Sequence, residues 1–307
     1  MEPPHLAGET VLVTGGAGFI GSHIASALVA DNEVRVLDDL SAGDRSRVPA
    51  GATLYDGDVR DQAALREAVD GVDVVFHEAA RVSVSDSVEA PSETNSVNLT
   101  GTLRVLEAAR REDARVVFAS SAAIYGEPTA VPIPEDEPTD PTSPYGVQKL
   151  AGDHYVRLYH DLFGLDTVAL RYFNVYGPGQ GSGGDYSGVI TVFVRQAVAG
   201  GPITVHGDGT QTRDFVHVSD VVQANLLAAT TPHVGEAYNV ASGQAITIRR
   251  LAETVSDVVD SDAEVVFEEP RQGDIDASEA DIGKARRQLG YDPQRGLAEG
   301  LADLVDS

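Results

Sequence analysis

The chain has no cysteine, no tryptophan, one methionine and only two lysines among its 307 residues. The lack of cysteine excludes disulfide bonds and thiolate zinc sites. The eight histidines show no metal-binding spacing, so we predict no metal ion. No apolar run approaches the roughly 20 residues that a membrane span needs, and residues 1–10 lack the basic-then-apolar order of a signal peptide. We therefore expect a cytoplasmic protein.

Basic side chains are scarce throughout, and the net charge is −26 with a pI near 4.4. Such a surface repels nucleic acid and anionic membranes, so we expect neither as a partner. The excess of acids and the shortage of lysine resemble the composition of proteins from extreme halophiles, where molar salt shortens the Debye length to about 3 Å. We therefore predict a halophilic protein.

Short apolar segments rich in β-branched residues alternate with helical segments. The predicted strands are 11–14, 34–38, 74–78, 115–120 and 167–172, and the predicted helices between them are 22–30, 62–69 and 99–111. This alternation predicts βαβ units with a buried parallel sheet. The fold class is therefore α/β, a doubly wound parallel sheet of Rossmann type.

The character of the chain changes after Asn174. Residues 177–188 are dense in glycine, proline and serine, which predicts a mobile loop. Helices are expected near 189–199, 218–230 and 249–260. We predict a nucleotide-binding domain over residues 1–174 and a smaller α/β region, mainly for substrate, over residues 175–307. Whether the part near 214–260 returns to the first domain, in particular around 236–240, stays open at this point.

A glycine-rich turn joins the first predicted strand to the first predicted helix. Gly15, Gly18 and Gly21 have the spacing GxxGxxG. Glycines at this spacing permit a tight turn, a close approach of the backbone to a pyrophosphate, and close packing of helix on strand. The helix N-terminus, at Phe19 and Ile20, offers N–H groups and a partial positive charge to the anion.

Two acids follow strands on the same side of the predicted sheet. Asp38 ends the second strand, where its carboxylate can accept hydrogen bonds from both ribose hydroxyls and would repel a 2′-phosphate, which favours NAD over NADP. The alternative is that Asp38 and Asp39 simply form a turn. Asp58, which precedes Val59, could reach the adenine amine, and a turn aspartate is again the alternative. All four residues are included in the expected NAD site.

One of the two lysines, Lys149, lies four residues after Tyr145, so both side chains share one helix face. A nearby cation favours phenolate over phenol and lowers a tyrosine pKa from about 10 toward neutrality. The pair is therefore suited to proton transfer, whereas an ordinary tyrosine with a solvated lysine is the alternative. Ser121 follows the predicted strand 115–120, at the carboxyl end where open parallel sheets bind ligands.

Together these motifs resemble those of the extended short-chain dehydrogenase/reductases, and within them the nucleotide-sugar 4-epimerases typified by UDP-galactose 4-epimerase. The segments that carry the resemblance are 14–21, 37–40, 77–80, 98–102, 120–126, 143–149, 171–177 and 209–220. The resemblance implies that Tyr145 is the acid/base, that Lys149 lowers its pKa and holds the nicotinamide ribose, and that Ser121 bonds the reacting hydroxyl.

The same resemblance implies further binding residues. Those expected to line NAD are Ala79, Ala80, Asn98 and Tyr172, and those expected to contact the nucleotide sugar are Asn174, Arg213 and Arg271. Two alternatives stay open. Asn98 could instead cap the predicted helix 99–111, and Arg213 could instead pair with Asp214.

The residues after Ser121 distinguish the reactions of this family. The 4,6-dehydratases carry an Asp-Glu pair there, decarboxylating relatives carry a glutamate, and fucose-synthase-like relatives place a cysteine nearby. This chain has Ala122-Ala123-Ile124 and no cysteine. The resemblance therefore implies epimerisation at C4 of a UDP-hexose, UDP-glucose/UDP-galactose, through a 4-keto intermediate with bound NAD. Alternatives are a UDP-glucuronate 4-epimerase, another nucleotide-sugar oxidoreductase such as a 4-ketoreductase, and a non-catalytic NAD-binding regulator.

Two finer expectations follow from the resemblance. Ser278 stands seven residues after Arg271, where glucose-restricted relatives carry a bulky tyrosine, which implies that N-acetylhexosamine forms are accepted. The predicted helices 99–111 and 145–163 correspond to those that form a four-helix dimer interface in relatives, which implies a homodimer.

Overall fold

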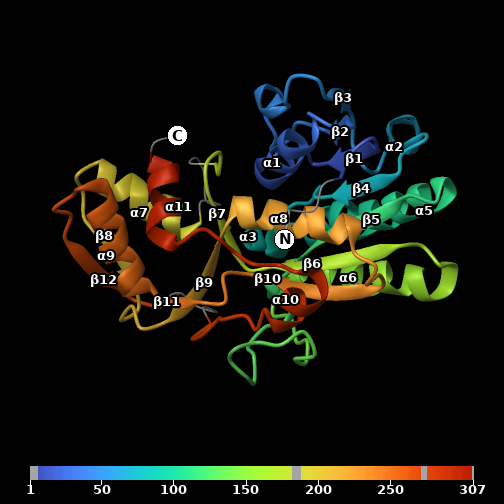
Figure 1. Ribbon diagram of the computed structural model, residues 1–307. Helices are drawn as coiled ribbons and strands as arrows, with labels where there is room; N and C mark the ends of the chain where they lie inside the picture. The colour runs from blue at the N-terminus through green and yellow to red at the C-terminus, as the bar shows by residue number, and fades with distance from the viewer. Residues whose placement is uncertain (1–5, 182–187, 271–274, 306–307) are drawn as a thin grey trace.

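The computed structural model describes residues 6–181, 188–270 and 275–305. A seven-stranded parallel sheet forms its centre (Figure 1). The strands are β1 (Thr10–Thr14), β2 (Glu33–Asp38), β3 (Thr53–Asp56), β4 (Val74–His77), β5 (Arg115–Ser121), β6 (Thr167–Tyr172) and β10 (Glu236–Val240). Their order is β10-β6-β5-β4-β1-β2-β3. This order confirms the doubly wound α/β fold.

The winding of the sheet reverses between β1 and β4. These strands are direct neighbours, with Thr14 opposite His77 at their carboxyl ends. From β1 the chain winds to β2 and β3 on one side, and from β4 it winds to β5, β6 and β10 on the other. Open α/β sheets bind ligands in the crevice outside the carboxyl ends of such strands. The segments that follow β1, β4 and β5 therefore border the expected site.

Helices cover both faces of this sheet. One face packs against α1 (Phe19–Leu28), α8 (Val218–Thr230) and α10 (Gly283–Leu289), and the other packs against α2 (Gln62–Val69), α5 (Thr102–Glu112) and α6 (Pro144–Phe163). Successive side chains of a strand point to opposite faces. Val11 and Val13 of β1 accordingly lie in one core and Leu12 lies in the other. Because both faces are buried there, the inner strands β1, β4, β5 and β6 are largely apolar, which made them detectable in the sequence, whereas the edge strand β3 has no buried residue.

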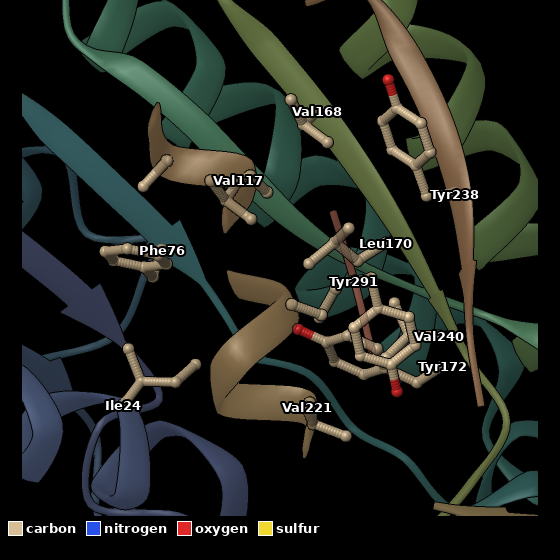
Figure 2. Packing of buried hydrophobic residues seen from close by; sticks show 14 of the residues in the cluster. Ile24, Phe76, Val117, Val168, Leu170, Tyr172, Val221, Tyr238, Val240 and Tyr291 are labelled. Carbon is tan, nitrogen blue, oxygen red and sulfur yellow. The ribbon is translucent and has the colours of Figure 1, made fainter. Parts of the chain in front are cut away.

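Figure 2 shows the core between the sheet and the helices α1 and α8. Ile24 of α1 and Val221 of α8 face sheet residues such as Phe76 and Leu170. Tyr291, from the C-terminal part of the chain, is also buried here, and its hydroxyl donates to the carbonyl of Ala241 at 2.9 Å. Full burial of one large side chain stabilises a fold by about 1.5–3 kcal/mol. Tyr291 therefore ties the C-terminal segment to the large sheet.

The predicted helices differ from the observed ones mainly at their starts, and β3 and several short helices lie outside the predicted ranges. The prediction of 62–69 coincides with α2, and that of 218–230 coincides with α8, whereas α1 begins at Phe19 rather than at residue 22. The predicted helix 99–111 corresponds to α5, which begins at Thr102 and is preceded by α3 (Val84–Glu89), α4 (Pro91–Asn95) and the π-helical turn η2 (Ser96–Gly101). Short 3-10 turns are η1 (Arg45–Arg47) and η3 (Ala122–Ile124). β10 pairs with β6, so the chain returns to the large sheet at residues 236–240.

A separate group of elements lies beyond the carboxyl edge of the sheet, on the left in Figure 1. It consists of a three-stranded sheet of β11 (Ala245–Thr247), β9 (Thr212–His217) and β7 (Asn174–Tyr176), a two-stranded sheet of β12 (Val265–Glu268) and β8 (Ile203–His206), and the helices α7 (Val189–Val198), α9 (Ile248–Val259) and α11 (Leu297–Val305). Phe193, Val205 and Leu251 belong to its own hydrophobic core. Half of the predicted loop 177–188, residues 182–187, lies outside the described residues. None of the helices in the described ranges is long and apolar enough to cross a membrane.

Candidate active site

The glycine turn after β1 forms a tight cradle. Gly15 has a φ of +71°, and a Cβ at this position would lie 2.7 Å from the backbone nitrogen of Ala79. A Cβ on Gly21 would collide with the carbonyl oxygen of Gly15. Gly18 is the N-cap of α1 and supplies no side-chain hydrogen bond to it. The first N–H groups of the helix, at Phe19 and Ile20, are therefore available to an anion, and the cradle fits a dinucleotide pyrophosphate.

Asp38 lies buried beside this cradle. Its Oδ2 accepts from the backbone N–H of Ala17 at 3.0 Å and its Oδ1 from that of Leu40 at 2.8 Å. Burial raises the pKa of Asp38, although the two backbone hydrogen bonds act to lower it. Asp39 is exposed and accepts from the N–H and hydroxyl of Ser41. Both aspartates thus accept hydrogen bonds that stabilise the turn after β2, as in the alternative given above. The carboxylate of Asp38 also lies at the end of β2, where the NAD site is expected.

Asp58 has a partner within the chain. Its carboxylate accepts from Arg60 Nε with both oxygens, each at 2.9 Å. The side-chain hydrogen bond of Arg60 lowers the pKa of Asp58, although burial acts to raise it. The next residue, Val59, is buried and packs against Gly101. The structure gives Asp58 a role in fixing the turn after β3, and contact with adenine stays a prediction.

The start of α6 holds the predicted proton-transfer residues. Ser143 caps this helix, with its hydroxyl accepting from the N–H of Gly146 at 3.1 Å, and Pro144 follows in the first turn. The N–H of Tyr145 donates to the Ser87 hydroxyl of α3 at 3.1 Å. Lys149, one helical turn further, is only 4% exposed. The cap thus sets where the helix begins and orients Tyr145 and Lys149 together.

Ser121, Tyr145 and Lys149 come together at the carboxyl end of β5. The side chains of Ser121 and Tyr145 form a hydrogen bond. Lys149 Nζ lies 5.9 Å from the centre of the Tyr145 ring and donates to the carbonyl of Ala119 at 2.7 Å. Ser121 was predicted from one segment and the Tyr145–Lys149 pair from another, and the fold brings the three residues together beside the glycine cradle.

The electrostatics of this group differ from the expectation. Burial raises the pKa of Tyr145 above its usual value, the hydrogen bond of Ser121 acts to lower it, and the charge of Glu78 acts to raise it. Burial lowers the pKa of Lys149 to about 8, while Glu78 acts to raise it. The pKa of Tyr145 is thus raised in the chain by itself, because burial disfavours the phenolate, and the effect of Lys149 on this pKa stays a prediction.

Glu78 is a site residue that the sequence did not single out. It directly follows β4, and its Oε1 accepts from the Tyr172 hydroxyl at 2.9 Å. Burial raises the pKa of Glu78 to about 7, while the Tyr172 hydrogen bond and the charge of Lys149 act to lower it. The hydroxyl of Tyr172 in turn accepts from Asn225 Nδ2 of α8 at 2.8 Å. The signal in the sequence was an acid at the carboxyl end of an apolar strand.

Asn98 fixes the loop that follows β4. Its Oδ1 accepts from the N–H of Arg81 at 2.7 Å, and its Nδ2 donates to the carbonyl of Arg81 at 2.9 Å and to Gln148 Oε1 at 2.8 Å. Asn98 lies inside the π-helical turn η2 and does not cap a helix, so the capping alternative is wrong. Through Arg81 it holds the segment with Ala79 and Ala80 against the glycine cradle.

Two of the predicted substrate residues line one cavity. Asn174 and Arg213 border a cavity of about 510 Å³ together with residues of α7, β8 and β12. Asn174 Nδ2 donates to the backbone carbonyl of Asp214 at 2.9 Å. The carboxylate of Asp214 accepts instead from the backbone N–H groups of Ser242, Gly243 and Ala280, so the predicted alternative of an Arg213–Asp214 pair is wrong. Neighbours along β9 point to opposite faces, which separates the two side chains.

The other two predicted substrate residues are Arg271 and Ser278. Arg271 lies outside the described residues. Ser278 is 4% exposed, and its N–H donates to the carbonyl of Thr212 at 3.1 Å. The carbonyl of the next residue, Glu279, accepts a hydrogen bond from the N–H of Ile133 at 2.7 Å, which also fixes this segment. Ser278 is not among the described residues that line the cavity of about 510 Å³ or the neighbouring cavity of about 1420 Å³. Its position beside a sugar therefore stays a prediction.

The described ranges contain no group of three or more histidine, aspartate or glutamate side chains that could hold a metal ion.

Comparisons with known proteins agree with this geometry. The family model described as "NAD dependent epimerase/dehydratase family" matches residues 11–241. A putative UDP-glucose 4-epimerase of Methanocaldococcus jannaschii is 39% identical, with 96% of this chain and 97% of the relative covered. A UDP-glucose 4-epimerase of Mycolicibacterium smegmatis is 38% identical at the same coverage of both chains.

Solved structures show the same likeness. UDP-N-acetylglucosamine 4-epimerase from Methanobrevibacter ruminantium, in complex with UDP-N-acetylmuramic acid, superposes with a TM-score of 0.94 at 38% identity over 98% of both chains. UDP-glucose 4-epimerase from Thermus thermophilus, in complex with NAD, superposes with a TM-score of 0.89 at 40% identity, covering 97% of this chain and 98% of that one. With the glycine cradle, the serine–tyrosine–lysine group and these similarities in agreement, the chain belongs to the NAD dependent epimerase/dehydratase family, the extended short-chain dehydrogenase/reductases.

Proposed function

We propose that this chain is an NAD-dependent UDP-hexose 4-epimerase that interconverts UDP-glucose and UDP-galactose. The observation that carries the proposal is that Ser121, Tyr145 and Lys149 come together beside the glycine cradle, with a cavity lined by Asn174 and Arg213 in the C-terminal region. The similarity to UDP-glucose 4-epimerases over nearly the whole chain supports it.

The residues of the cradle would hold NAD. Gly15, Gly18 and Gly21 leave room for the pyrophosphate, and Asp38 offers its carboxylate to the adenosine ribose. The chemistry that NAD would supply at this site is reversible hydride transfer at C4 of the sugar. The similarity to a relative solved with NAD supports this assignment.

Proton transfer falls to Tyr145. As phenolate, its oxygen takes the proton of the 4-hydroxyl, and the phenol so formed later returns a proton to the 4-keto oxygen, which is general base and general acid chemistry at one atom. Ser121 forms a hydrogen bond with Tyr145 and can bond the same sugar oxygen. Lys149, held by the carbonyl of Ala119, keeps a positive charge next to the phenol. For the product to be the epimer, the 4-keto sugar must present its opposite face before reduction.

The turn after Ser121 favours epimerisation over elimination. The residues of η3, Ala122, Ala123 and Ile124, carry no ionisable group. The N–H of Ala123 donates to Ser121 Oγ at 3.2 Å, which fixes this turn against the catalytic serine. Loss of water from the sugar would need an acid and a base at this position, as the dehydratases of the family have.

A direct assay tests the proposal. The purified protein is incubated in molar salt with UDP-galactose and no added reductant, and formation of UDP-glucose is followed. UDP-glucuronate is tested in parallel. Conversion of UDP-galactose with no net consumption of cofactor supports the proposal. Exclusive turnover of UDP-glucuronate would assign the chain to the uronate epimerases, and stoichiometric consumption of added NADH would make it a reductase. NAD binding without any turnover would make it a cofactor-binding regulator.

A homodimer is part of the proposal. The outer face of α6 exposes a row of large apolar side chains: Val147, Tyr155, Leu158, Leu162 and Phe163. The guanidinium of Arg110 in α5 lies 4.9 Å from the centre of the Phe163 ring, so α5 and α6 share this face. Exposed apolar rows of this kind favour a protein–protein contact.

Sedimentation in molar salt measures the oligomeric state. We expect a dimer for the native chain and a monomer for the double variant Leu158→Glu, Leu162→Glu, because two new charges would be buried in the contact. A native chain that sediments as a monomer would contradict the dimer. The cytoplasmic location and the halophilic character remain predictions.

A further inference from the structure

Helix α6, which carries Tyr145, lies directly against strand β5, which ends in Ser121. Close contact is possible because residue 152 of the helix is glycine: a Cβ on Gly152 would lie only 2.7 Å from Cζ of the Phe118 ring. The hydrogen bond between the side chains of Ser121 and Tyr145 joins the same two elements. The position of α6 along β5 therefore decides whether these two side chains meet.

A buried carboxylate of α6 binds two strands beneath the helix. Asp153 lies about two turns after Tyr145 and has no exposed surface. Its Oδ2 accepts from the Ser120 hydroxyl at 3.0 Å and from Arg171 Nε at 2.9 Å. Ser120 of β5 and Arg171 of β6 are directly opposite each other in the sheet. Asp153 thus joins both strands to the helix, at the residue directly before Ser121.

Arg171 extends this contact to the segment that follows Ser121. Its Nη1 donates to the Tyr125 hydroxyl at 2.9 Å. Tyr125 directly follows η3 and is buried, and its hydroxyl donates in turn to Asn239 Oδ1 at 2.7 Å. The end of β5 is therefore held on both sides of Ser121, by Ser120 before it and by Tyr125 after it.

Stability alone does not account for an ion pair at this place. Burial acts to raise the pKa of Asp153, but the hydrogen bond and the charge of Arg171 outweigh burial and lower this pKa, so the carboxylate stays charged. Removing both charges from water costs free energy, and apolar side chains of similar volume in place of such a pair are often neutral or stabilising. Directed hydrogen bonds, however, fix one register between two elements. The pair is thus better suited to fixing the position of α6 than to stabilising the fold.

We propose that Asp153 and Arg171 are positioning residues of the reaction: through the Ser120 hydroxyl, their buried ion pair keeps Ser121 within hydrogen-bonding distance of Tyr145. The inference rests on the proposed function, in which Ser121 and Tyr145 bond the same sugar oxygen. Without the pair, the end of β5 can shift against α6, and the hydrogen bond between Ser121 and Tyr145 weakens. A misplacement of about 1 Å can lower a rate about 10²-fold, so the pair acts on turnover without touching the sugar.

The test observes the hydrogen bond of Tyr145 in the NAD-loaded protein without sugar. Tyrosine labelled with carbon-13 at Cζ is incorporated, and the resonance of Tyr145 is assigned by its absence in Tyr145→Phe. Ser121→Ala then gives the position of this resonance when the hydrogen bond is lost. Thermal unfolding establishes that each variant is folded.

Two variants break the contact in different ways. Asp153→Leu combined with Arg171→Met replaces the ion pair with apolar side chains. Ser120→Ala retains the ion pair and removes only its hydrogen bond to β5, so it decides the question if the double variant does not fold. Arg157→Gln is the control, because Arg157 Nε donates to Asp153 Oδ1 at 3.0 Å from the same helix, and its side chain is 31% exposed.

We expect the Tyr145 resonance to move toward its position in Ser121→Ala, most of the way in the double variant and part of the way in Ser120→Ala. Arg157→Gln should keep the native resonance. With UDP-galactose, kcat should fall about tenfold in the double variant and less in Ser120→Ala, while KM stays unchanged because Asn174 and Arg213 remain in place.

A native resonance in either folded variant would overturn the proposal. An equal shift in Arg157→Gln would also overturn it, because the contact with β5 would then not be what matters. Since the resonance is measured without sugar, a protein that shows the expected shifts but does not epimerise UDP-galactose would count against the proposed function and not against the role of Asp153 and Arg171.

Discussion

In the large sheet the candidate residues follow the carboxyl ends of neighbouring strands, whereas in the C-terminal region they come from segments held together by long-range hydrogen bonds. Gly15 follows β1, Asp38 ends β2 and Ser121 ends β5. Ser278 is held instead by the carbonyl of Thr212, on a strand more than sixty residues away. The first arrangement follows from sheet topology and tolerates changes elsewhere, while the second depends on a few specific contacts. Substitutions in the two regions should therefore have different consequences.

The largest effect is expected at the proton-transfer group of the large sheet. Tyr145→Phe removes the hydroxyl that bonds Ser121 and leaves the helix and the ring in place. General acid–base groups contribute about 10²–10⁴-fold to rate, so turnover of UDP-galactose should fall by this factor while NAD still binds. Tyr155→Phe is the matched control, because Tyr155 lies on the exposed face of the same helix.

Steady-state assays and equilibrium NAD binding measure these two quantities. Turnover of Tyr145→Phe within a few-fold of the native rate would rule out Tyr145 as the acid/base. A loss of NAD binding in the same variant would instead show that the hydroxyl serves the cofactor site.

Much of the large sheet could be predicted from the sequence, for physical reasons. Its strands are buried on both faces, so they stand out as short apolar runs, and the spacing of Gly15, Gly18 and Gly21 has one compatible backbone path. Tyr145 and Lys149 share a helix face by spacing alone. Such features are local, and local geometry can be derived from the order of residues.

The charge balance of the site could not be predicted in the same way. The contact between Glu78 and Tyr172 joins residues 94 positions apart, and no rule based on sequence spacing predicts it. The raised pKa of Tyr145 depends on burial, which appears only once the chain is folded. The hydrogen bonds of Asn98 to Arg81 were not predicted, because a polar residue near a helix start usually caps it, whereas here the helical turns begin earlier and Asn98 lies inside η2.

The second prediction concerns the cradle itself. Gly21→Ala places a Cβ against the backbone carbonyl of Gly15, which cannot yield as a flexible side chain would. Overpacking against a rigid neighbour costs about 1–3 kcal/mol, so we expect NAD affinity to fall by up to about 100-fold and the free energy of unfolding to decrease. Gly296→Ala is the control, because no atom lies within 4 Å of its added Cβ.

Calorimetric binding and thermal unfolding measure the two effects. Native-like NAD affinity in Gly21→Ala would mean that the turn relaxes to make room for the Cβ. The contrast between a site set by strand order and a C-terminal region set by a few specific contacts would then fail.

The third prediction tests a substrate residue of the C-terminal region. Ser278 is buried, and if it faces the sugar 2-position, the native chain should interconvert N-acetylated UDP-hexosamines as well as UDP-hexoses. Ser278→Tyr should then lose the N-acetylated substrates selectively, by about 1–3 kcal/mol of overpacking, and retain exchange of UDP-glucose and UDP-galactose. Ser278→Ala, which adds no volume, should keep both activities.

The ratio of kcat/KM for the two substrate classes is the measurement. The similarity to a relative named UDP-N-acetylglucosamine 4-epimerase supports the expectation. Equal loss of both activities in Ser278→Tyr, or no change in either, would place Ser278 away from the sugar.

The smallest effect is expected for cofactor choice at Asp38. The Asn side chain of Asp38→Asn keeps an oxygen that can accept from the N–H of Leu40, so the turn after β2 should persist, but it removes the negative charge that would repel a 2′-phosphate. The native chain should prefer NAD over NADP, and the variant should lose about tenfold of this preference, since only one partly screened charge is removed. Asp61→Asn removes the same charge from an exposed helix N-cap, where asparagine caps equally well, and it should leave the preference unchanged. Competition binding of NAD and NADP measures both ratios. A native chain that binds NADP as tightly as NAD would show that the carboxylate of Asp38 serves only the turn. The cofactor site would then depend, as the C-terminal region does, on contacts that strand order does not reveal.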